Sequence, residues 1–419
     1  MNQGNYNKFL LLWAGQLISS IGGGLTSFGL GIYIFQKTGN ASGTALLTLL
    51  AFLPGLLLKV PAGVLADRYD RRLLMMIGDG FSGLGVLLIL LCMMRGDAAT
   101  WQIYTGVVIS SVFSALLEPA FTATITDLLT KEQFSKANGL VSMAGSAGYL
   151  FSPIIAGFLL TVSDIKVILA IDIATFFVTI TAAAVVRRGL PNKEAENRTP
   201  FFTSMKEGWK VITGKRGLLP LILITSLVTL FMGVFQVLAG PFVLSFSDEK
   251  SLGIVETVAA SGMLVSGAIL GIRGIKRNFV RKLSLGLTAS GLAMAMFGVS
   301  HNLFVIGTFG FLFFLAIPVA NNSLDYLART NIPKELQGRA WGMIGFLSQS
   351  GYVVAYGLSG VVADVVGRAT GKGVGGGSAA TIFAAGMCLA AIAIGLGRVA
   401  RIRELEPAGT DSIGGCSEC

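Results

Sequence analysis

The sequence predicts an all-α polytopic membrane protein, with twelve transmembrane helices arranged as two pseudo-symmetric six-helix bundles. Three observations support this fold class. Of the 419 residues, 53% are hydrophobic and only 13% are charged, whereas soluble chains usually contain nearer a quarter charged residues. Apolar runs of about 20 residues recur along the chain, and each is long enough to cross a bilayer as a helix. Two segments half a chain apart also repeat each other.

Short polar loops separate the expected spans. The first apolar run is too long for a secretory signal and no small-residue cleavage site follows it, so we expect it to remain as a first span. The twelve expected spans are residues 8–35, 43–66, 73–94, 101–125, 139–161, 166–186, 217–245, 252–272, 281–299, 302–325, 339–363 and 378–398. They divide the chain into an N-terminal six-helix bundle at 1–187, a cytoplasmic linker at 188–215, a C-terminal six-helix bundle at 216–400 and a cytoplasmic tail at 401–419.

The positions of the basic residues predict the orientation. An even number of spans puts both termini on one side of the membrane. Of the 32 Lys and Arg residues, 25 lie near the termini or in loops on that side, six lie on the opposite side, and Lys59 lies within a span. Since cytoplasmic loops are enriched in Lys and Arg, both termini are predicted to be cytoplasmic. This distribution accounts for the net charge of +10 without a nucleic-acid partner.

The internal repeat relates segments that are 203 residues apart. Lys131 and Glu132 fall on Lys334 and Glu335, and several glycines in the spans that follow also coincide. A parallel repeat of six spans is what a two-fold axis along the membrane normal requires. Both repeated spans contain small residues four positions apart. These faces predict helix–helix contacts, because helices in lipid associate through close backbone approach.

The linker and one outer loop have their own patterns. Four large apolar residues of the linker recur at helical spacing: Phe202, Met205, Trp209 and Ile212. This pattern predicts either an amphipathic helix on the inner membrane surface or an N-terminal extension of span seven. The glycine-rich segment 367–378 is predicted to form a flexible external loop.

Little in the sequence supports an enzyme, a metal site or a cofactor site. His301 is the single histidine, so the sequence offers few residues for a hydrolase triad and too few for a histidine-rich metal site. The C-terminal tail contains two thiols, Cys416 and Cys419, whereas a structural zinc site needs four ligands. The glycines at 78–83 fit a dinucleotide-binding spacing but lie within a span, without a preceding strand. We therefore expect no catalytic residue, no metal and no cofactor.

The segment Gly63–Arg72, with the sequence GVLADRYDRR, places a dense charge cluster between two apolar spans. Such a cluster must lie in a short loop at the membrane surface, and an ordinary basic hairpin is one interpretation. The pattern also resembles the signature loop between helices two and three of the major facilitator superfamily of secondary transporters. The matching residues are Gly63, Leu65, Asp67, Arg68, Arg71 and Arg72, and Asp70 replaces the usual second glycine.

This resemblance implies a conformational latch formed by Gly63, Asp67, Arg68, Arg71, Arg72 and Asp127. In the family, the signature aspartate and arginine lock the cytoplasmic ends of the two halves in the outward-open state. Asp67 would lie at the cytoplasmic N-terminus of span eleven, where the helix dipole favours an anion. Arg71 and Asp127 would join it in a charge relay. One six-span half would then rock against the other and expose a central site alternately.

Span five contains the sequence GYLFSPIIAG, from Gly148 to Gly157. It resembles the antiporter motif of proton-coupled drug exporters. Gly148, Pro153 and Gly157 match that motif, while Ser152 and Ala156 stand where glycines are usual. The resemblance implies exchange of protons for substrate. A packing face with a proline kink is the alternative interpretation.

Charged residues inside the spans need a reason, because each costs about 3 kcal/mol near the bilayer centre. Glu118 lies nine residues before Asp127 at the end of span four, which is roughly 13 Å deep at about 1.5 Å per residue. Asp172 lies six residues into span six. Both are candidates for proton coupling, since burial favours the neutral form of a carboxyl group. For each of them, a hydrogen-bonded structural carboxyl is the alternative.

Three further charges are placed by their distance from span ends. Lys59 and Asp79 flank the signature loop at similar distances. A tight hairpin of spans two and three would bring them to similar depth, so we expect a structural ion pair. A substrate-binding Lys59 is the alternative. Glu256, early in span eight, is expected to reach the outer interface.

Other segments narrow the family resemblance. The opening YNKFLLLWAGQLISSIG, the signature loop and IPKELQGRAWG before span eleven resemble the macrolide-efflux and siderophore (enterobactin-type) exporter branch of drug:proton antiporters. This resemblance implies proton-coupled efflux of an amphipathic drug or secreted metabolite by alternating access. The expected partners are that small molecule, protons and membrane lipids, and a monomer in the bacterial inner membrane is expected.

The expected substrate cavity is largely apolar and is lined from spans one, four, seven and ten. Its polar points are Gln16, Glu118, Gln236 and Asn321. Two alternative functions remain for such a chain. One is a lipid or lysolipid flippase of the same fold, and the other is a non-transporting membrane scaffold or sensor.

Overall fold

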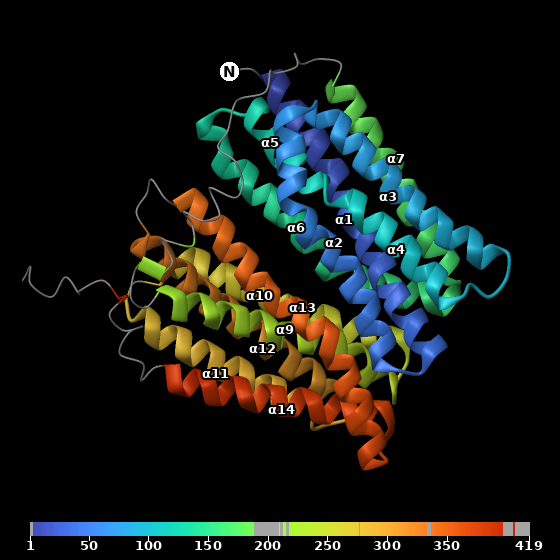
Figure 1. The fold of residues 1–419 in the computed structure, drawn as a ribbon, viewed down its shortest axis with the longest axis vertical. Helices are drawn as coiled ribbons and strands as arrows, with labels where there is room; N and C mark the ends of the chain where they lie inside the picture. The colour runs from blue at the N-terminus through green and yellow to red at the C-terminus, as the bar shows by residue number, and fades with distance from the viewer. Residues whose placement is uncertain are drawn as a thin grey trace, which may run out of the picture.

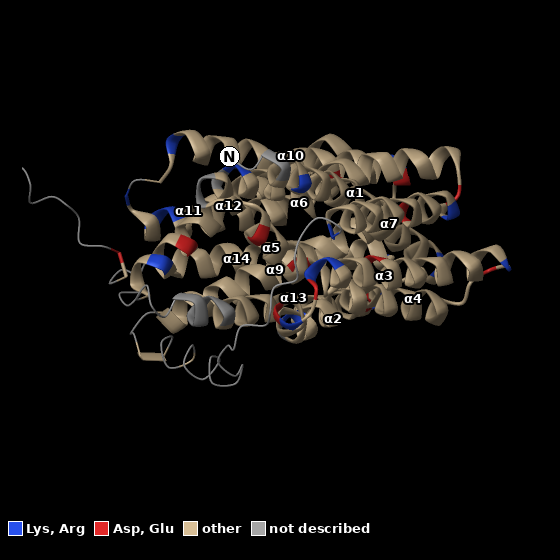
Figure 2. Cartoon of the chain, turned by 90° about the horizontal axis from the view of Figure 1, so that it is seen from above, with Lys and Arg blue, Asp and Glu red and all other residues tan. Residues whose placement is uncertain are grey.

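The computed structural model of the protein describes residues 3–187, 209, 213–214, 218–275, 277–332, 337–396 and 405–406. Within these ranges the chain is almost entirely helical, and charged residues gather mainly near helix ends (Figure 2). Most of the linker, including Phe202, Met205 and Ile212, lies outside the described residues. So does the tail with Cys416 and Cys419.

The N-terminal bundle contains α1 (Gln3–Thr38), α2 (Ala41–Arg68), α3 (Arg71–Met94), α4 (Thr100–Ser114), α5 (Leu117–Leu128), α6 (Lys131–Val162) and α7 (Ile165–Arg187). The C-terminal bundle contains α9 (Leu218–Leu244), α10 (Glu249–Arg273), α11 (Phe279–Phe297), α12 (Leu303–Asn331), α13 (Gln337–Thr370) and α14 (Gly373–Leu396). The predicted all-α polytopic fold is confirmed.

Eleven segments within the described ranges are long and apolar enough to cross a membrane, when α4 and α5 are taken as one span. The remaining expected span corresponds to α11. This helix is 19 residues long, has Arg281 and Lys282 in its first turn, and packs along α12 and α14. Span four, expected as one helix, is interrupted between Ser114 and Leu117. Pro119 explains the break, because proline has no N–H and its ring clashes with the carbonyl four residues earlier.

The expected flexible loop at 367–378 is wrong. Helix α13 continues to Thr370 and α14 begins at Gly373, so only a tight turn separates them. Gly371 and Gly373 have φ values of +68° and +67°, which glycine adopts without strain. Gly377 then lets α14 approach α13 closely, since a Cβ on it would lie 2.6 Å from the backbone nitrogen of Gly367.

The two bundles are related as the sequence repeat predicted. Helix α6 packs against α1 and α10, and its counterpart α13 packs against α9 and α2. The repeated glycines make these contacts close. A Cβ on Gly148 would lie 2.7 Å from the Ser20 carbonyl of α1, and one on Gly351 would meet the Ser226 carbonyl of α9. Each repeated helix therefore contacts its own bundle on one side and the other bundle on another side.

The bundles converge at one end and diverge at the other (Figure 1). We call the first the closed end, which contains Ala41 and Asp364, and the second the signature-loop end, which contains Gly63–Arg72. At the closed end, the Asp364 carboxylate accepts hydrogen bonds from the backbone N–H groups of Ala41 (2.9 Å) and Ser42 (3.0 Å). The buried Asp364 side chain of α13 thus caps the N-terminus of α2 across the bundle interface.

Candidate transport cavity

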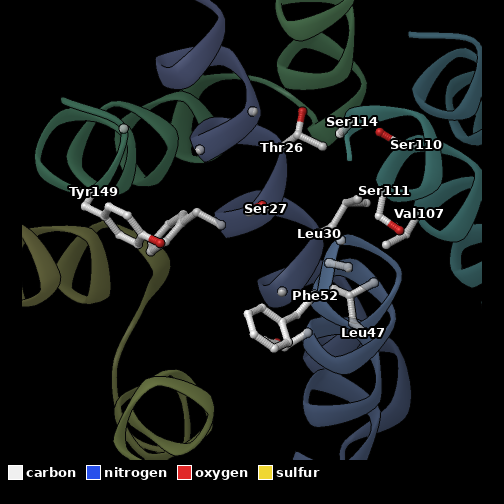
Figure 3. A pocket seen from close by; sticks show the side chains of 18 of the residues that line it. Thr26, Ser27, Leu30, Leu47, Phe52, Val107, Ser110, Ser111, Ser114 and Tyr149 are labelled. Carbon is white, nitrogen blue, oxygen red and sulfur yellow. The ribbon is translucent and has the colours of Figure 1, made fainter. Parts of the chain in front are cut away.

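A cavity of about 790 Å³ is lined by residues from both bundles, within the size range of small-molecule sites. Most of its lining comes from α1–α7, and α9, α10 and α13 complete it. In Figure 3, Tyr149 of α6 approaches from one side, Ser111 of α4 from the other, and Phe52 of α2 from below. The arrangement presents apolar rings and hydroxyl groups to the same space.

One wall of the cavity is rich in hydroxyl groups. Ser82 of α3 lies 2.7 Å from the Oγ of Ser110 and 2.9 Å from the Oγ of Ser114, both on α4. The spacing of Ser110 and Ser114 places them on one helix face, which makes them available together to α3. Our sequence analysis did not select these serines, although serines four residues apart in an apolar span are a signal for such a face.

Beside the cavity, aromatic side chains join the two bundles. The Phe52 ring of α2 lies 5.6 Å from the Tyr352 ring and 5.5 Å from the Tyr356 ring, measured between centroids. Tyr356 donates a hydrogen bond of 2.6 Å to the side-chain oxygen of Gln236, which lines the cavity as predicted. These rings contribute large contact areas at separations typical of favourable aromatic pairs.

Four charged residues line the cavity: Lys59, Glu118, Asp172 and Glu256. The expected Lys59–Asp79 ion pair is wrong, because Lys59 Nζ lies 3.5 Å from the Glu118 carboxylate instead. Distance from the loop sets depth along a helix but not the face on which a side chain lies, and Asp79 faces α7. The Glu118 side chain is 74% exposed and that of Lys59 is 52% exposed, so this pair is solvated from the cavity.

Asp172 and Asp79 form a buried acidic pair in the N-terminal bundle. Asp172 is 1% exposed and Asp79 is 3% exposed. Thr175 Oγ1 lies 3.5 Å from the Asp172 carboxylate, and Asp79 lies beside Thr179 and close enough to Asp172 to interact with it electrostatically. Asp172, Thr175 and Thr179 share one face of α7. Two carboxyl groups are therefore held among hydroxyls.

Asp172 of the buried pair also lies against α1, which lines the cavity. Gly22 of α1 approaches so closely that a Cβ there would lie 2.8 Å from Asp172 Oδ1 and 2.6 Å from Thr175 Oγ1. Glycine is the residue that allows this approach. Because of this contact, a shift of the Asp172 side chain would displace α1, which lines the cavity.

The antiporter-like residues lie where α6 meets two neighbours. Ser152 Oγ donates a hydrogen bond of 2.9 Å to the Ile21 carbonyl of α1. On the other side, a Cβ on Gly157 would lie 2.8 Å from the Glu249 carbonyl of α10, and the Pro153 carbonyl faces Gly253 of the same helix. Gly148, Ser152, Pro153 and Gly157 thus form both the α1 contact and the bundle interface.

The structure brings several latch residues together at the signature-loop end. Arg71 Nη1 lies 2.7 Å from Asp127 Oδ2 and 2.9 Å from the Ala123 carbonyl, and the buried Arg72 lies 3.8 Å from Asp127. Arg68 is exposed and Asp67 is half-buried. No neighbouring helix of the described chain covers Gly63, since a Cβ on it would meet nothing within 4 Å.

Asp70, which replaces a glycine of the signature pattern, has a local structural role. Its carboxylate caps α3 by accepting from the Arg72 backbone N–H at 3.0 Å, and it accepts from Arg187 Nε at 2.6 Å. Partial burial opposes ionisation, but the hydrogen bonds from Arg187 and Arg72 outweigh it and lower the pKa of Asp70.

Two expected cavity residues are not part of the lining. Gln16 of α1 lies nearer the signature-loop end than Ser19, the first α1 residue of the cavity, and Asn321 of α12 is exposed elsewhere. Helix α12 contributes nothing to the lining, because it packs mainly against α10 and α11. Glu256 corrects the sequence analysis in the other direction: it lines the cavity rather than the outer interface.

Two pseudo-symmetric helical bundles around a central cavity define a transporter of small molecules rather than an enzyme. The model of the Major Facilitator Superfamily matches residues 12–356, and the chain belongs to this family. It is a multi-pass membrane protein.

Several relatives in that family are named as efflux proteins. It is similar to macrolide efflux protein A of Streptococcus pyogenes, with 26% identity over 86% of this chain and 90% of the relative. It is also similar to the enterobactin exporter EntS of Shigella boydii, with 23% identity over 67% of each chain.

Solved structures of low identity share the fold. One is a bacterial homologue of the human lysosomal transporter Spinster, described as inward-facing and unoccupied. It aligns with a TM-score of 0.76 and 14% identity over 97% of this chain and 99% of that chain.

Proposed function

We propose that the protein exports an amphipathic small molecule in exchange for protons by alternating access. The observation that supports this most is the combination of a central cavity lined by both bundles with a buried carboxyl pair at its wall. The efflux relatives support the direction of transport. We place the protein in the bacterial inner membrane as a monomer, with lipids around its apolar surface.

The proposed orientation puts both termini and the signature loop in the cytoplasm, as the distribution of Lys and Arg predicts. The closed end then faces outward, and the structure corresponds to an inward-open state. The bundles at residues 1–187 and 216–400 would rock as two bodies joined by the linker at 188–215, and the tail at 401–419 would stay cytoplasmic. The exposed backbone at Gly63 is consistent with this state, because a helix of the other bundle could pack against it only after the signature-loop end closes.

Asp172 is the proposed proton carrier, and Asp79 joins it in place of Glu118. A carboxylate without a cationic partner in a buried site is costly, so protonation relieves that cost. Protonation at Asp172 acts on α1 through the close contact at Gly22. Movement of α1 reaches the bundle interface through the Ser152 hydrogen bond and the α6–α10 contact. Glu118, paired with Lys59 and solvated, is assigned to the substrate cavity.

The latch is proposed to form in the alternate state. Asp67 would then cap the N-terminus of α13 while Arg71 and Asp127 hold the loop beside it. The Arg71–Asp127 pair is already present here, so only the contact between bundles needs to form. Gly63 leaves room for that approach, and Arg68 and Arg72 complete the basic loop.

Efflux measurements on Asp172→Asn test this proposal. In cells that accumulate a radiolabelled macrolide, the wild type should lower accumulation until an uncoupler is added. D172N should lose at least tenfold of this activity but keep substrate counterflow in proteoliposomes, because exchange needs no net proton movement. Asp164→Asn is the matched control, since Asp164 is exposed and its carboxylate forms an ion pair with the neighbouring Lys166.

Two outcomes contradict the proposal. Full uncoupler-sensitive efflux by D172N removes the proton site. If the wild type changes the accumulation of no tested drug but moves labelled lysolipid across vesicles, the flippase alternative replaces export.

A further inference from the structure

Glu256 is a carboxyl group inside the membrane that the proposed proton pathway does not use. It lies seven residues beyond Glu249, the first residue of α10, and therefore about 10 Å along the helix at roughly 1.5 Å per residue. It lines the central cavity together with Leu252, one turn earlier on the same helix. Its side chain is half-buried, so the cavity is its contact with solvent.

No residue of the described chain donates a hydrogen bond to Glu256 or forms an ion pair with it. The other charges of the cavity are accounted for. Lys59 and Glu118 lie 3.5 Å apart, and Asp172 is held by Thr175 behind α1. Among the lining residues there are three carboxyl groups and one amine. Within the described chain, Glu256 is thus the cavity carboxyl group that has neither a hydrogen-bond donor nor an ion-pair partner.

Such a group is expensive unless something compensates it. An intramembrane carboxylate costs several kcal/mol when unpaired, and intramembrane acids mark ligand or ion pathways. A ligand cation that binds beside Glu256 would exchange part of its hydration for a charge-assisted contact. A cation carried by the substrate could compensate Glu256, because Lys59, the amine in the described lining, already pairs with Glu118.

The remaining lining suits the rest of such a ligand. Phe28, Phe52 and Tyr149 present aromatic rings to the same cavity. Aromatic faces attract cations and also cover apolar groups. The serine wall of α3 and α4 offers hydroxyl groups for neutral polar substituents. An anionic ligand would meet an excess of negative charge throughout this space.

We propose that Glu256 is a specificity-determining residue that binds the cationic group of the substrate, so that the cavity selects amphipathic cations over anions. This inference rests on the proposed function for the identity of the cavity as the transport site. The carboxylate would contact the onium or ammonium centre directly, and the aromatic rings would cover the hydrophobic substituents.

Ligand binding to the purified full-length protein tests the proposal without any need for transport. The probe is tritiated tetraphenylphosphonium, a hydrophobic cation that cannot donate a proton, measured by scintillation proximity. The matched anion is labelled tetraphenylborate, which has nearly the same shape and is assayed in separate samples because the two ions precipitate together. The wild type should bind the cation saturably and bind the anion much more weakly. Glu256→Gln should weaken binding at least tenfold, and Glu256→Asp should recover most of the affinity because it keeps the charge.

Several results overturn the proposal. These are the absence of saturable cation binding by the wild type, equal affinity of the wild type for the anion, or unchanged cation affinity in E256Q. If E256Q does not elute as a monodisperse protein, the comparison of cation and anion on the wild type decides alone. Saturable cation binding without efflux in cells would reject the proposed function and leave this inference standing. Efflux with no preference for cations would do the reverse.

Discussion

Helices α2 and α13 meet at the closed end and separate toward the signature-loop end. This one pair of helices therefore shows the bundle interface both packed and unpacked. At the closed end, Asp364 of α13 caps the N-terminus of α2, and a Cβ on Gly360 would lie 2.7 Å from the Ala41 carbonyl. At the other end, Gly63 of α2 has no such neighbour. The interface is thus closed by two kinds of contact: a carboxylate at a helix N-terminus and close backbone packing at a glycine.

The same two components exist at the signature-loop end, in a different arrangement. Asp67 is a carboxylate near the C-terminus of α2, as Asp364 is near the C-terminus of α13. If the proposed latch forms, each helix caps the other at opposite ends of the pair, and only one cap is made at a time. Substitutions at the two ends should therefore have separable effects.

The largest effect is expected from filling the close contact at the closed end. Gly360→Val places a branched side chain where even an added Cβ would lie 2.7 Å from Ala41 O and Ala45 Cβ, and backbone contacts of this kind cannot yield. Transport measured as drug efflux should fall more than tenfold. Gly357→Val on the same helix is the matched control, because a Cβ there meets nothing within 4 Å. Similar losses in both variants would show that valine harms α13 generally.

Removing the cap between bundles should have an intermediate effect. Asp364→Asn loses a charge at a helix N-terminus, which is worth about 1 kcal/mol, or roughly a fivefold shift in a two-state equilibrium. The closed end should open more often, and a cysteine introduced at Ser27 in the cavity, in a background lacking native cysteines, should react faster with an impermeant maleimide applied from outside.

Asp248→Asn is the control for that measurement. Asp248 caps α10 within its own bundle by accepting from Ser251 N at 2.8 Å. Its loss should lower stability slightly without changing the labelling rate. Equal acceleration in both variants would mean that caps at this end affect only helix stability.

The smallest effect is expected from Asp70, whose contacts stay within one bundle. Asp70→Ala removes a helix cap, which typically costs about 1 kcal/mol, so the melting temperature of the purified protein should fall by a few degrees while efflux is kept. Since the pKa of Asp70 is lowered in the folded state, its contribution is present above the ordinary carboxyl pKa and is lost as pH falls through the lowered value. The difference between wild type and variant should therefore vanish in acid.

The sequence predicted the features that depend on periodicity and local pattern. Apolar run length predicted the spans, and the offset repeat predicted that Gly148 and Gly351 would occupy equivalent contacts. The pairing of Arg71 with Asp127, expected from family resemblance, is present in the structure.

Features that depend on helix rotation or on distant partners were not predicted. Lys59 and Asp79 have the expected depth but different faces. Glu256 faces the cavity because of the way α10 packs on α6 and α12, which its position along the chain does not encode. The Asp364 cap joins residues more than 300 positions apart, so no local pattern could reveal it.

The most direct test of alternating access measures both ends of the bundle interface in the same protein. Spin labels at exposed positions Asn40 and Thr370 report on the closed end, and labels at Tyr69 and Thr330 report on the signature-loop end. Distances measured by pulsed electron paramagnetic resonance should show two populations for each label pair. Conditions that lengthen the distance at the closed end should shorten the distance at the signature-loop end. Distances that change together, or one population at both ends under every pH and ligand condition, would contradict the account.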